Sequence, residues 1–295
     1  MDIKHIPKIN VENAEAREYV ISAAKYWVKE FGIDGYRLDH AIGPSLDFWK
    51  EFKKEVKKIN KDFALIGEAG KALGAYLNET IKKELVETLW ITNSASARVK
   101  KRIRALVEKG DLESCIEFND LMMKELEGVT DACIDFTFRD LAWALADKKI
   151  DFREFWKKLG RHYGRFGGGS ESPQGRPFGL KEPKPEGLRN AGFHSEAQAK
   201  EEGSRAKARG SYLISLLSNH DCGRFLAEFG KSPAEFSSIL QFLVKGPTLI
   251  YYGEEIGLKG GGKFEGARHF MPWDKRSWDK ELLEHYQGLC GLRTS

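Results

Sequence analysis

The strongest constraint on the fold is a regular alternation of helical periods and short apolar runs along the chain. Apolar residues recur at helical spacing over residues 14–31, and a short apolar run at 35–39 follows directly. Strands are predicted near residues 35–39, 63–67, 132–136, 212–217 and 248–252, and helices over 14–31, around Trp49 and Phe52, over most of 77–126, over 139–147 and 151–160, and from about 279 onward. Such alternation is typical of parallel βαβ units, so an α/β fold is expected.

The number of strands leaves two architectures open at this point. A closed (β/α)8 barrel needs eight strands and about 250 residues. The five predicted strands do not close a barrel by themselves, and an open doubly wound sheet fits the same composition. Residues 164–209 lack a sustained apolar period and contain three consecutive glycines, so we expect a long loop or insertion there.

Two helices carry more specific expectations. The helix at 14–31 is predicted to bury one apolar face, formed by Val20, Ala24, Trp27, Val28 and Phe31. Residues 232–235, with the sequence SPAE, have the pattern of a capping box with proline at the first helical position, which predicts a helix that begins there. That helix is predicted to bury Phe236, Ile239, Leu240 and Leu243.

Composition excludes several classes of protein. The 295 residues are 41% hydrophobic, enough for a sizeable core, and a formal charge of +4 from 48 basic and 44 acidic residues gives no case for nucleic-acid binding. No stretch is long and apolar enough to cross a bilayer, and no apolar signal segment opens the sequence, so a cytoplasmic protein is expected. The four cysteines lack metal-ligand spacing and are expected to be reduced thiols. Three histidines, His162, His194 and His269, are expected to be ordinary loop residues.

Three carboxylates follow apolar strands at the point where each strand ends. Asp39, Glu68 and Asp221 stand after the runs at 35–38, 63–67 and 212–217. In parallel α/β folds the carboxyl ends of the strands face the ligand crevice. A single such residue could merely cap the next helix, whereas three are harder to explain in that way. Arg37 points to the same side of its strand as Asp39, because side chains alternate along a strand.

Glycoside hydrolysis uses this set of groups. One carboxylate attacks the anomeric carbon, and a carboxyl group with a raised pKa protonates the leaving oxygen and later activates water. Arg37 can keep Asp39 ionised, and the apolar run before Glu68 favours a raised pKa for Glu68. A third carboxylate with a neighbouring histidine, Asp221 with His220, can bind sugar hydroxyls.

Several segments resemble the conserved motifs of the α-amylase family, glycoside hydrolase family 13. The segments, in chain order, are GIDGYRLDHA (32–41), LIGEA (65–69), SNHD (218–221), GPTLIYYGEE (246–255) and MPWD (271–274). They resemble the family's fourth-, fifth-, seventh- and eighth-strand motifs and the loop beyond strand eight. Residues 6–10, with the helix after them, resemble the stretch before strand four in neopullulanase-like members.

The resemblance implies a fold and a set of residue roles. The fold would be part of a (β/α)8 (TIM) barrel with strands four to eight over residues 1–295, lacking the first three strands and the C-terminal β-sandwich. Asp39 would be the nucleophile, Glu68 the acid/base and Asp221 the stabiliser of the transition state. The expected substrate-binding residues are Arg37, His40, Asn219 and His220.

The resemblance also implies a substrate and leaves alternatives open. The expected activity is retaining hydrolysis of α-glucosidic bonds in starch-like glucans, maltooligosaccharides or cyclodextrins. The alternatives are a transglycosylase of the same family, or an inactive or split fragment that needs an N-terminal half-barrel partner. No cofactor and no metal are expected, because the family's usual calcium site draws its ligands from the part of the barrel that this sequence lacks.

Overall fold

Four short parallel strands form the centre of the computed structural model, which describes residues 9–70, 97–166, 212–260 and 266–294. The strands are β1 (Gly35–Leu38), β2 (Ala64–Gly67), β3 (Ala132–Asp135) and β4 (Tyr212–Ser215), and they lie in that order in one sheet. All three pairings are parallel, with Arg37 opposite Ile66 and Cys133 opposite Leu213. The α/β fold with a parallel sheet is therefore confirmed.

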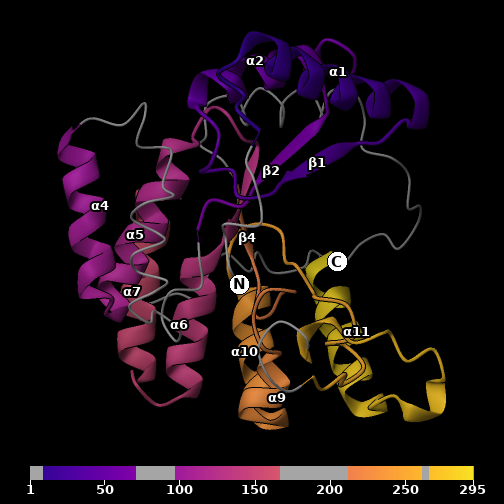
Figure 1. Cartoon of the computed structure of the whole chain (residues 1–295). Helices are drawn as coiled ribbons and strands as arrows, with labels where there is room; N and C mark the ends of the chain where they lie inside the picture. Colours follow the sequence, from indigo (N-terminus) through magenta and orange to yellow (C-terminus); the bar gives the residue numbers. More distant parts are fainter. Residues whose placement is uncertain (1–8, 71–96, 167–211, 261–265, 295) are drawn as a thin grey trace, which may run out of the picture.

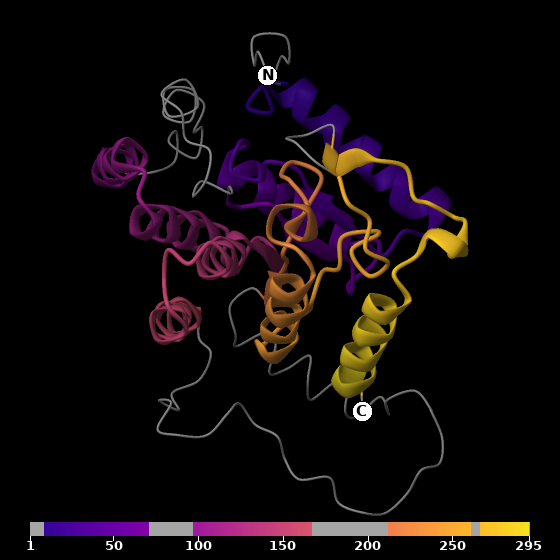
Figure 2. The ribbon, with the colours of Figure 1, turned by 90° about the horizontal axis from the view of Figure 1, so that it is seen from below.

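Helices pack around the sheet in three groups that follow the chain (Figure 1). The helices are α1 (Ala14–Phe31), α2 (Leu46–Lys57), α4 (Ala97–Lys109), α5 (Leu112–Glu125), α6 (Phe136–Ala146), α7 (Phe152–Arg165), α9 (Phe225–Phe229), α10 (Lys231–Leu243) and α11 (Lys280–Thr294), with short 3-10 turns η3 (Gly266–Arg268) and η4 (Lys275–Ser277). Helices α1 and α2 lie together, α4 to α7 form a second group, and α9, α10 and α11 a third (Figure 1). The rotated view shows α10 and α11 side by side (Figure 2).

The predicted fifth strand is much shorter than expected. Within 248–252, Thr248 forms a single parallel bridge with Ser215, and Leu249 donates a 2.8 Å backbone hydrogen bond to the Ser215 carbonyl. The chain then turns, because the Tyr251 amide donates to the Glu254 carboxylate at 3.0 Å. The prediction of a full strand over 248–252 is therefore wrong in extent. The expected loop at 164–209 begins within α7, and residues 167–211 lie outside the described part of the chain.

The buried face of α1 differs from the predicted one. Ile21, Ala24 and Val28 are buried, whereas Trp27 is 49% and Phe31 60% exposed. The core stripe follows positions 21, 24 and 28, and Trp27 lies further around the helix, whereas Phe31 keeps the spacing of the stripe but is the last residue of α1. The rings of Trp27 and Phe31 contact each other in a tilted arrangement, with centroids 4.7 Å apart.

The start of α10 also differs from the prediction. The helix begins at Lys231 after Gly230, whose φ of 83° is in the left-handed region, and no side chain caps its first turn. Phe236, Ile239 and Leu243 are largely exposed, whereas Leu240 is buried as expected. Gln241 takes a buried place instead, because its amide nitrogen donates to the Ser215 and Leu249 carbonyls at 3.0 Å each and so ties α10 to β4.

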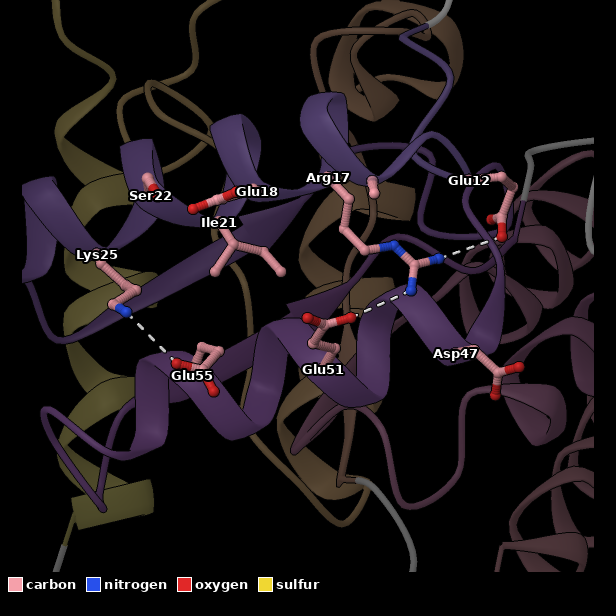
Figure 3. A pocket seen from close by; sticks show the side chains of 10 residues that line it. Glu12, Arg17, Glu18, Ile21, Ser22, Lys25, Asp47, Glu51 and Glu55 are labelled. Carbon is pink, nitrogen blue, oxygen red and sulfur yellow. Dashed lines mark hydrogen bonds and ion pairs between the residues drawn. The ribbon is translucent and has the colours of Figure 1, made fainter.

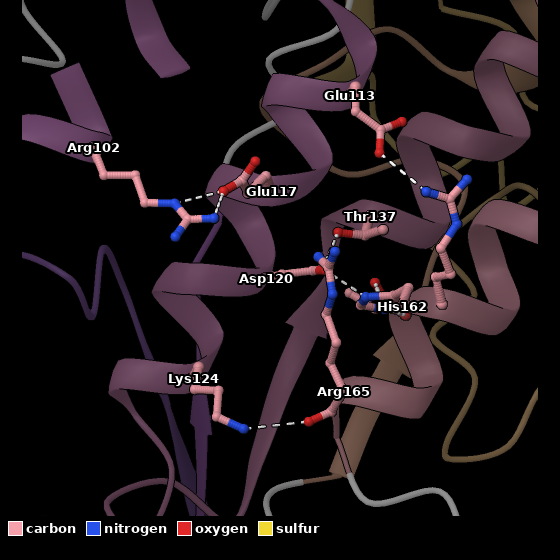
Figure 4. A network of polar contacts seen from close by, with 10 residues as sticks. Arg102, Glu113, Glu117, Asp120, Lys124, Thr137, His162 and Arg165 are labelled. Carbon is pink, nitrogen blue, oxygen red and sulfur yellow. Dashed lines mark hydrogen bonds and ion pairs between the residues drawn. The ribbon is translucent and has the colours of Figure 1, made fainter. Parts of the chain in front are cut away.

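His162 belongs to the core, which corrects the expectation of a loop residue. It lies fully buried in α7, with Nδ1 2.6 Å from the Asp120 carboxylate of α5 and Nε2 3.1 Å from the Asp135 carboxylate at the end of β3 (Figure 4). Thr137 and Arg165 also contact Asp120. Burial alone would lower the pKa of His162, but the two carboxylates outweigh it and raise the pKa to about 9.

The last helix is fastened to the turn after α10 by one arginine. Nη1 of Arg293 donates to the carbonyls of Phe242 at 2.7 Å and Val244 at 3.0 Å, and Nη2 donates to the carbonyl of Gly246. These bonds satisfy carbonyls at the C-terminal end of α10 that have no partner within the helix. We call this set of contacts the Arg293 latch. None of the helices described by the structure is long and apolar enough to span a membrane.

Candidate active site

Two of the predicted catalytic carboxylates follow neighbouring strands. Asp39 directly follows β1 and Glu68 directly follows β2, and parallel pairing brings the two strand ends together. The ladder continues past the strands, since the Glu68 amide donates to the Leu38 carbonyl and the Ala41 amide to the Glu68 carbonyl, both at 3.0 Å. The backbones on either side of the two carboxylates are thus fixed against each other.

Arg37 lies between these two carboxylates. Its Nη1 contacts Oδ1 of Asp39, and its Nη2 lies 2.9 Å from Oε1 of Glu68. The other oxygen of Glu68 accepts a 3.0 Å hydrogen bond from the His40 amide. His40 has a φ of 44°, a backbone conformation uncommon for residues other than glycine, and this turn directs its N–H toward Glu68.

The environments of Asp39 and Glu68 differ strongly. The side chain of Asp39 is 75% exposed, whereas that of Glu68 is 13% exposed. Burial raises the pKa of Glu68, against the opposing effects of the His40 amide and the Arg37 charge. The negative charges of Asp39 and Asp221 raise the pKa of Glu68 further, so both lie within electrostatic range of it. One carboxyl group of the site is thus biased toward its protonated form.

Asp221 is held by a second arginine from another part of the chain. Nη2 of Arg268 lies 3.0 Å from Asp221 Oδ1, and Nε of Arg268 donates to the His220 carbonyl at 2.9 Å. The other oxygen of Asp221 lies 3.2 Å from Nε2 of His220. Nothing in the sequence pattern singled out Arg268, which is half-exposed and reaches Asp221 from the turn η3.

Asn219 is buried and acts within its own loop. Its Oδ1 accepts a 3.0 Å hydrogen bond from the Asp221 amide and a 2.8 Å hydrogen bond from the Cys222 thiol. This placement fits a residue that braces the turn more directly than one that contacts a sugar. Next to it, Ser218 donates a hydrogen bond to the buried carboxylate of Glu254, whose pKa burial raises to about 7. Asn219 and Glu254 therefore both stabilise the loop that carries His220 and Asp221.

Trp273 and Phe270 are the most exposed aromatic residues near the site. Trp273 is 79% and Phe270 98% exposed, so neither ring packs in the core. Both follow Arg268 closely in the sequence. The Tyr252 hydroxyl donates to the His269 carbonyl at 2.6 Å and fastens this segment to the chain that follows β4.

A groove lined by other residues lies away from this site. It has a volume of about 760 Å³ between α1 and α2 and is lined mainly by charged side chains (Figure 3). Arg17 pairs across it with Glu12 and Glu51 at 3.1 Å each, and Lys25 pairs with Glu55 at 3.4 Å. None of the predicted site residues lines the groove, and its charges pair mostly with one another.

A metal centre is not evident within the described ranges. No group of three or more histidine, cysteine, aspartate or glutamate side chains there is arranged to hold a metal ion. The expectation of no metal and no cofactor stays a prediction. Chemically, the site combines an exposed carboxylate paired with arginine, a buried carboxyl group with a raised pKa, and a third carboxylate beside a histidine. Such a set can supply a nucleophile and a general acid.

Comparison with known proteins identifies the relatives of this chain. Residues 1–140 match the family model described as Alpha amylase, catalytic domain. The chain is 27% identical over 290 residues to a cyclomaltodextrinase of Bacillus sp., which covers 98% of this chain and 36% of the relative. It is 28% identical over 303 residues to α-amylase 2 of Dictyoglomus thermophilum, which covers 99% of this chain and 38% of the relative.

A solved structure shares the fold over nearly the whole chain. The cyclic α-maltosyl-(1→6)-maltose hydrolase of Arthrobacter globiformis, in complex with maltose, superposes with a TM-score of 0.61 at 24% identity. The match covers 97% of this chain and 46% of that one. The chain thus spans little more than a third of the length of the curated relatives described above. The family-model match over residues 1–140 and the relatives agree, and the chain is similar to members of the α-amylase family, glycoside hydrolase family 13.

Proposed function

We propose that the chain carries the catalytic carboxylates of a retaining glycosidase that acts on α-glucosidic bonds of starch-like glucans, maltooligosaccharides or cyclodextrins. The relatives, named as a cyclomaltodextrinase and an α-amylase, support this class of substrate. In this proposal strands β1 to β4 and the segment that forms the bridge at Thr248 correspond to strands four to eight of a (β/α)8 barrel. Because the relatives are nearly three times as long, the activity is proposed for the site and is tested on the chain itself.

The proposed reaction is a double displacement. Asp39 attacks the anomeric carbon while Glu68 protonates the departing glycosidic oxygen, which leaves a glucosyl ester on Asp39. Glu68, now ionised, removes a proton from water, and the resulting hydroxyl attacks the same carbon and releases Asp39. Asp221 and His220 bind sugar hydroxyls and stabilise the flattened ring, and Arg37 orients Asp39 and Glu68.

The observation that carries the proposal is the difference in burial between two carboxyl groups that contact the same arginine. Arg37 contacts both Asp39 and Glu68, yet Glu68 is buried with a raised pKa, whereas Asp39 is exposed to solvent. A glycosidase needs this division, since one carboxylate must be ionised to attack and the other protonated to donate. If Asp39 and Glu68 only capped the helices that follow them, this difference in protonation would serve no purpose.

The test is turnover of maltotriose by the purified chain and its variants. We expect Asp39→Asn and Glu68→Gln each to lower kcat by at least ~100-fold, the usual contribution of a nucleophile or general acid. Asp47→Asn is a matched control, because Asp47 is an exposed carboxylate on α2 outside the site. A wild-type chain with no turnover, or an Asp39→Asn variant as active as the control, would refute the proposal.

The stereochemistry tests the retaining mechanism separately. NMR of the products in the first minutes should show the α-anomer of the new reducing end ahead of mutarotation. Initial release of the β-anomer would mean that water attacks directly and that Asp39 forms no ester.

Transglycosylation is the alternative within the same chemistry, with a sugar hydroxyl in place of water in the second step. Analysis of maltotriose digests separates the two reactions. Products longer than maltotriose would favour transglycosylation, whereas glucose and maltose alone favour hydrolysis.

A second alternative is a chain that needs a partner. We propose that any such partner is an N-terminal half-barrel that pairs with β1, the edge of the described sheet, and covers the exposed aromatic face of α1. Activity that appears only after a segment that supplies strands one to three of the proposed barrel is added would support this alternative over an autonomous enzyme.

A further inference from the structure

A buried arginine lies beneath the loop that carries Asp221. Arg139, in the first turn of α6, is 1% exposed and pairs with the equally buried Asp140 at 2.8 Å. Its Nε and Nη2 have no hydrogen-bond partner among the described residues. A buried ion pair of this kind is costly to form, and an apolar pair of similar volume would often be more stable. Core stability alone therefore does not account for Arg139.

Arg139 is linked by contacts to the segment that leads into the Asp221 loop. Its guanidinium lies 4.2 Å from the centroid of the Trp143 ring, and Nε1 of Trp143 donates a 2.9 Å hydrogen bond to the Leu217 carbonyl. Leu217 immediately precedes residues 218–222, which we call the Asp221 loop. The arginine and the indole ring thus fix the path of the chain at the entrance to this loop.

The charge of Arg139 also acts on the far end of the Asp221 loop. Burial raises the pKa of the Cys222 thiol, and the positive charge of Arg139 opposes this effect. The thiol donates to Oδ1 of Asn219 at 2.8 Å, and the same oxygen accepts the Asp221 amide at 3.0 Å. The entrance of the loop is therefore held by contacts of Arg139 and Trp143, and the charge of Arg139 acts on Cys222 at its far end.

The same network reaches the loop after Glu68. The Asp140 carboxylate accepts a 3.4 Å hydrogen bond from the amide group of Asn119. Asn119 packs tightly against Gly70, because a Cβ at Gly70 would lie 2.8 Å from its side-chain oxygen. Packing and polar contacts through Asn119, Asp140 and Arg139 thus connect the chain beyond Glu68 with the entrance of the Asp221 loop.

We propose that Arg139 is a positioning residue that, through Trp143 and Cys222, holds the Asp221 loop in the geometry required by the reaction proposed above. Supporting groups of this kind fix the residues that contact substrate, and small displacements of such residues are costly in rate. The inference rests on the proposed function for its catalytic part. The holding of the loop can be measured without catalysis.

The first experiment measures thiol protection in the intact chain. Cys290 is exposed, whereas Cys115, Cys133 and Cys222 are buried, so iodoacetamide labelling mapped by mass spectrometry reports each position separately. In Arg139→Met we expect alkylation of Cys222 to rise about tenfold, since a contact made by a charged group is lost, while Cys115 and Cys133 stay protected. Loss of the positive charge by itself would raise the thiol pKa and slow alkylation, so a faster rate can arise only from opening of the loop.

Two further variants, Arg139→Lys and Trp143→Phe, test whether the labelling of Cys222 depends on the contacts of Arg139. Arg139→Lys retains the charge, and we expect Cys222 to label more slowly in it than in Arg139→Met. Trp143→Phe removes the hydrogen bond to the Leu217 carbonyl and should expose Cys222 selectively. If Arg139→Met unfolds, all three buried cysteines will label together, and Trp143→Phe then decides. Unchanged protection of Cys222 in the folded variants would overturn the proposal.

The second experiment separates kcat from KM. Because Asp221 stabilises the transition state, Arg139→Met should lower kcat for maltotriose about tenfold or more with KM changed less than about twofold, and Arg139→Lys should recover part of kcat. Arg102→Met, which breaks an exposed ion pair with Glu117, is the control and should keep wild-type constants. Wild-type kcat in Arg139→Met would refute the catalytic part. A wild-type chain without turnover refutes the proposed function, and the thiol rates alone then decide whether Arg139 holds the loop.

Discussion

At the scale of single residues, Glu68 has its acidity set by neighbours that act in opposite directions. Burial and the negative charges of Asp39 and Asp221 raise its pKa, whereas the His40 amide and the Arg37 charge lower it. As a general acid, Glu68 must be protonated, so kcat/KM should fall as the pH rises through the pKa of Glu68. The alkaline limb of the pH–rate profile therefore reports the pKa of Glu68 and the effect of its neighbours on that pKa.

Two substitutions should shift that limb in opposite directions. Arg37→Met removes a positive charge, raises the pKa of Glu68 and moves the limb to higher pH, although the rate itself falls. Asp221→Asn removes a negative charge and moves the limb to lower pH. The measurement is kcat/KM for maltotriose from pH 4 to 9, with Lys50→Met, an exposed residue of α2, as the control. Shifts in the same direction for both variants would contradict the assignment of the limb to Glu68.

The residues that sequence reasoning found and missed differ in a physical way. Asp39, Glu68 and Asp221 follow apolar runs closely, so local pattern and family motifs both mark them. Arg268 reaches Asp221 across a large separation in sequence, and an exposed arginine in a turn has no periodic signature. His162 looked like a loop residue because it is a single polar residue, and its two carboxylate partners come from other elements.

At the scale of elements, the starts of α1 and α10 show that a capping motif in the sequence does not always mark the first residue of a helix. Asn13 caps α1, with its side chain accepting a 3.0 Å hydrogen bond from the Ala16 amide. The serine of the predicted capping box, Ser232, already lies inside α10, because Gly230 in its left-handed conformation begins the helix earlier. The motif was present, but the preceding glycine determined the path of the chain.

The two positions make a matched pair for mutagenesis. We expect Asn13→Ala to lower the free energy of unfolding by about 1 kcal/mol, the usual loss for an N-cap. Ser232→Ala should change it by less than about 0.5 kcal/mol, as for an exposed position away from special features. Urea unfolding followed by circular dichroism checks both values. If Ser232→Ala lowers the free energy of unfolding more than Asn13→Ala does, Ser232 acts as a cap and the predicted capping box is supported.

His162 of α7 contacts carboxylates of α5 and β3, so the packing of these three elements depends on pH. Its pKa is raised from the ordinary value of 6.5 to about 9 in the folded chain. Charged His162 between Asp120 and Asp135 therefore stabilises the fold fully below about pH 6.5, and this stabilisation is lost as the pH rises through about 9.

The corresponding variant is His162→Gln, which keeps hydrogen-bonding groups but not the charge. We expect a loss of roughly 3–5 kcal/mol near neutral pH, since the buried carboxylates lose their cation. The difference from wild type should shrink as the pH approaches 9 in urea titrations. A difference that stays constant across this range would show that the charge of His162 is not what stabilises the contact.

At the scale of the whole molecule, one end of the sheet is less covered than the other. Strand β1 has no second neighbour among the described strands, and Tyr26, Trp27 and Phe31 form an exposed aromatic cluster on α1. An unpaired strand edge and an exposed apolar face each favour association with other chains.

Sedimentation velocity can test this expectation. Trp27→Ser combined with Phe31→Ser should reduce self-association of the chain at micromolar concentration. Phe270→Ser is the matched control, because Phe270 is even more exposed but lies on the segment next to Asp221. If the control reduces association equally, the contact depends on general surface hydrophobicity and not on the face of α1.

The parallel order of the sheet was predictable, whereas its extent was not. Strands β1 to β4 each combine an apolar run with flanking helices, so their order follows from the sequence. The segment 248–252 has the same apolar character, yet it pairs at one point and then turns, because the Glu254 carboxylate captures the Tyr251 amide. The extent of this strand depends on one glutamate side chain and on a single bridge to the distant Ser215, and an apolar period encodes neither.

The Arg293 latch has a consequence for how the sequence can vary. Its acceptors are main-chain carbonyls of Phe242, Val244 and Gly246, so replacing the side chains at 242 or 244 leaves every acceptor in place. Insertion or deletion of one residue between 242 and 246 would instead carry the carbonyls out of reach. Among homologues, the residue types along this turn should therefore vary, whereas the number of residues in the turn should stay constant.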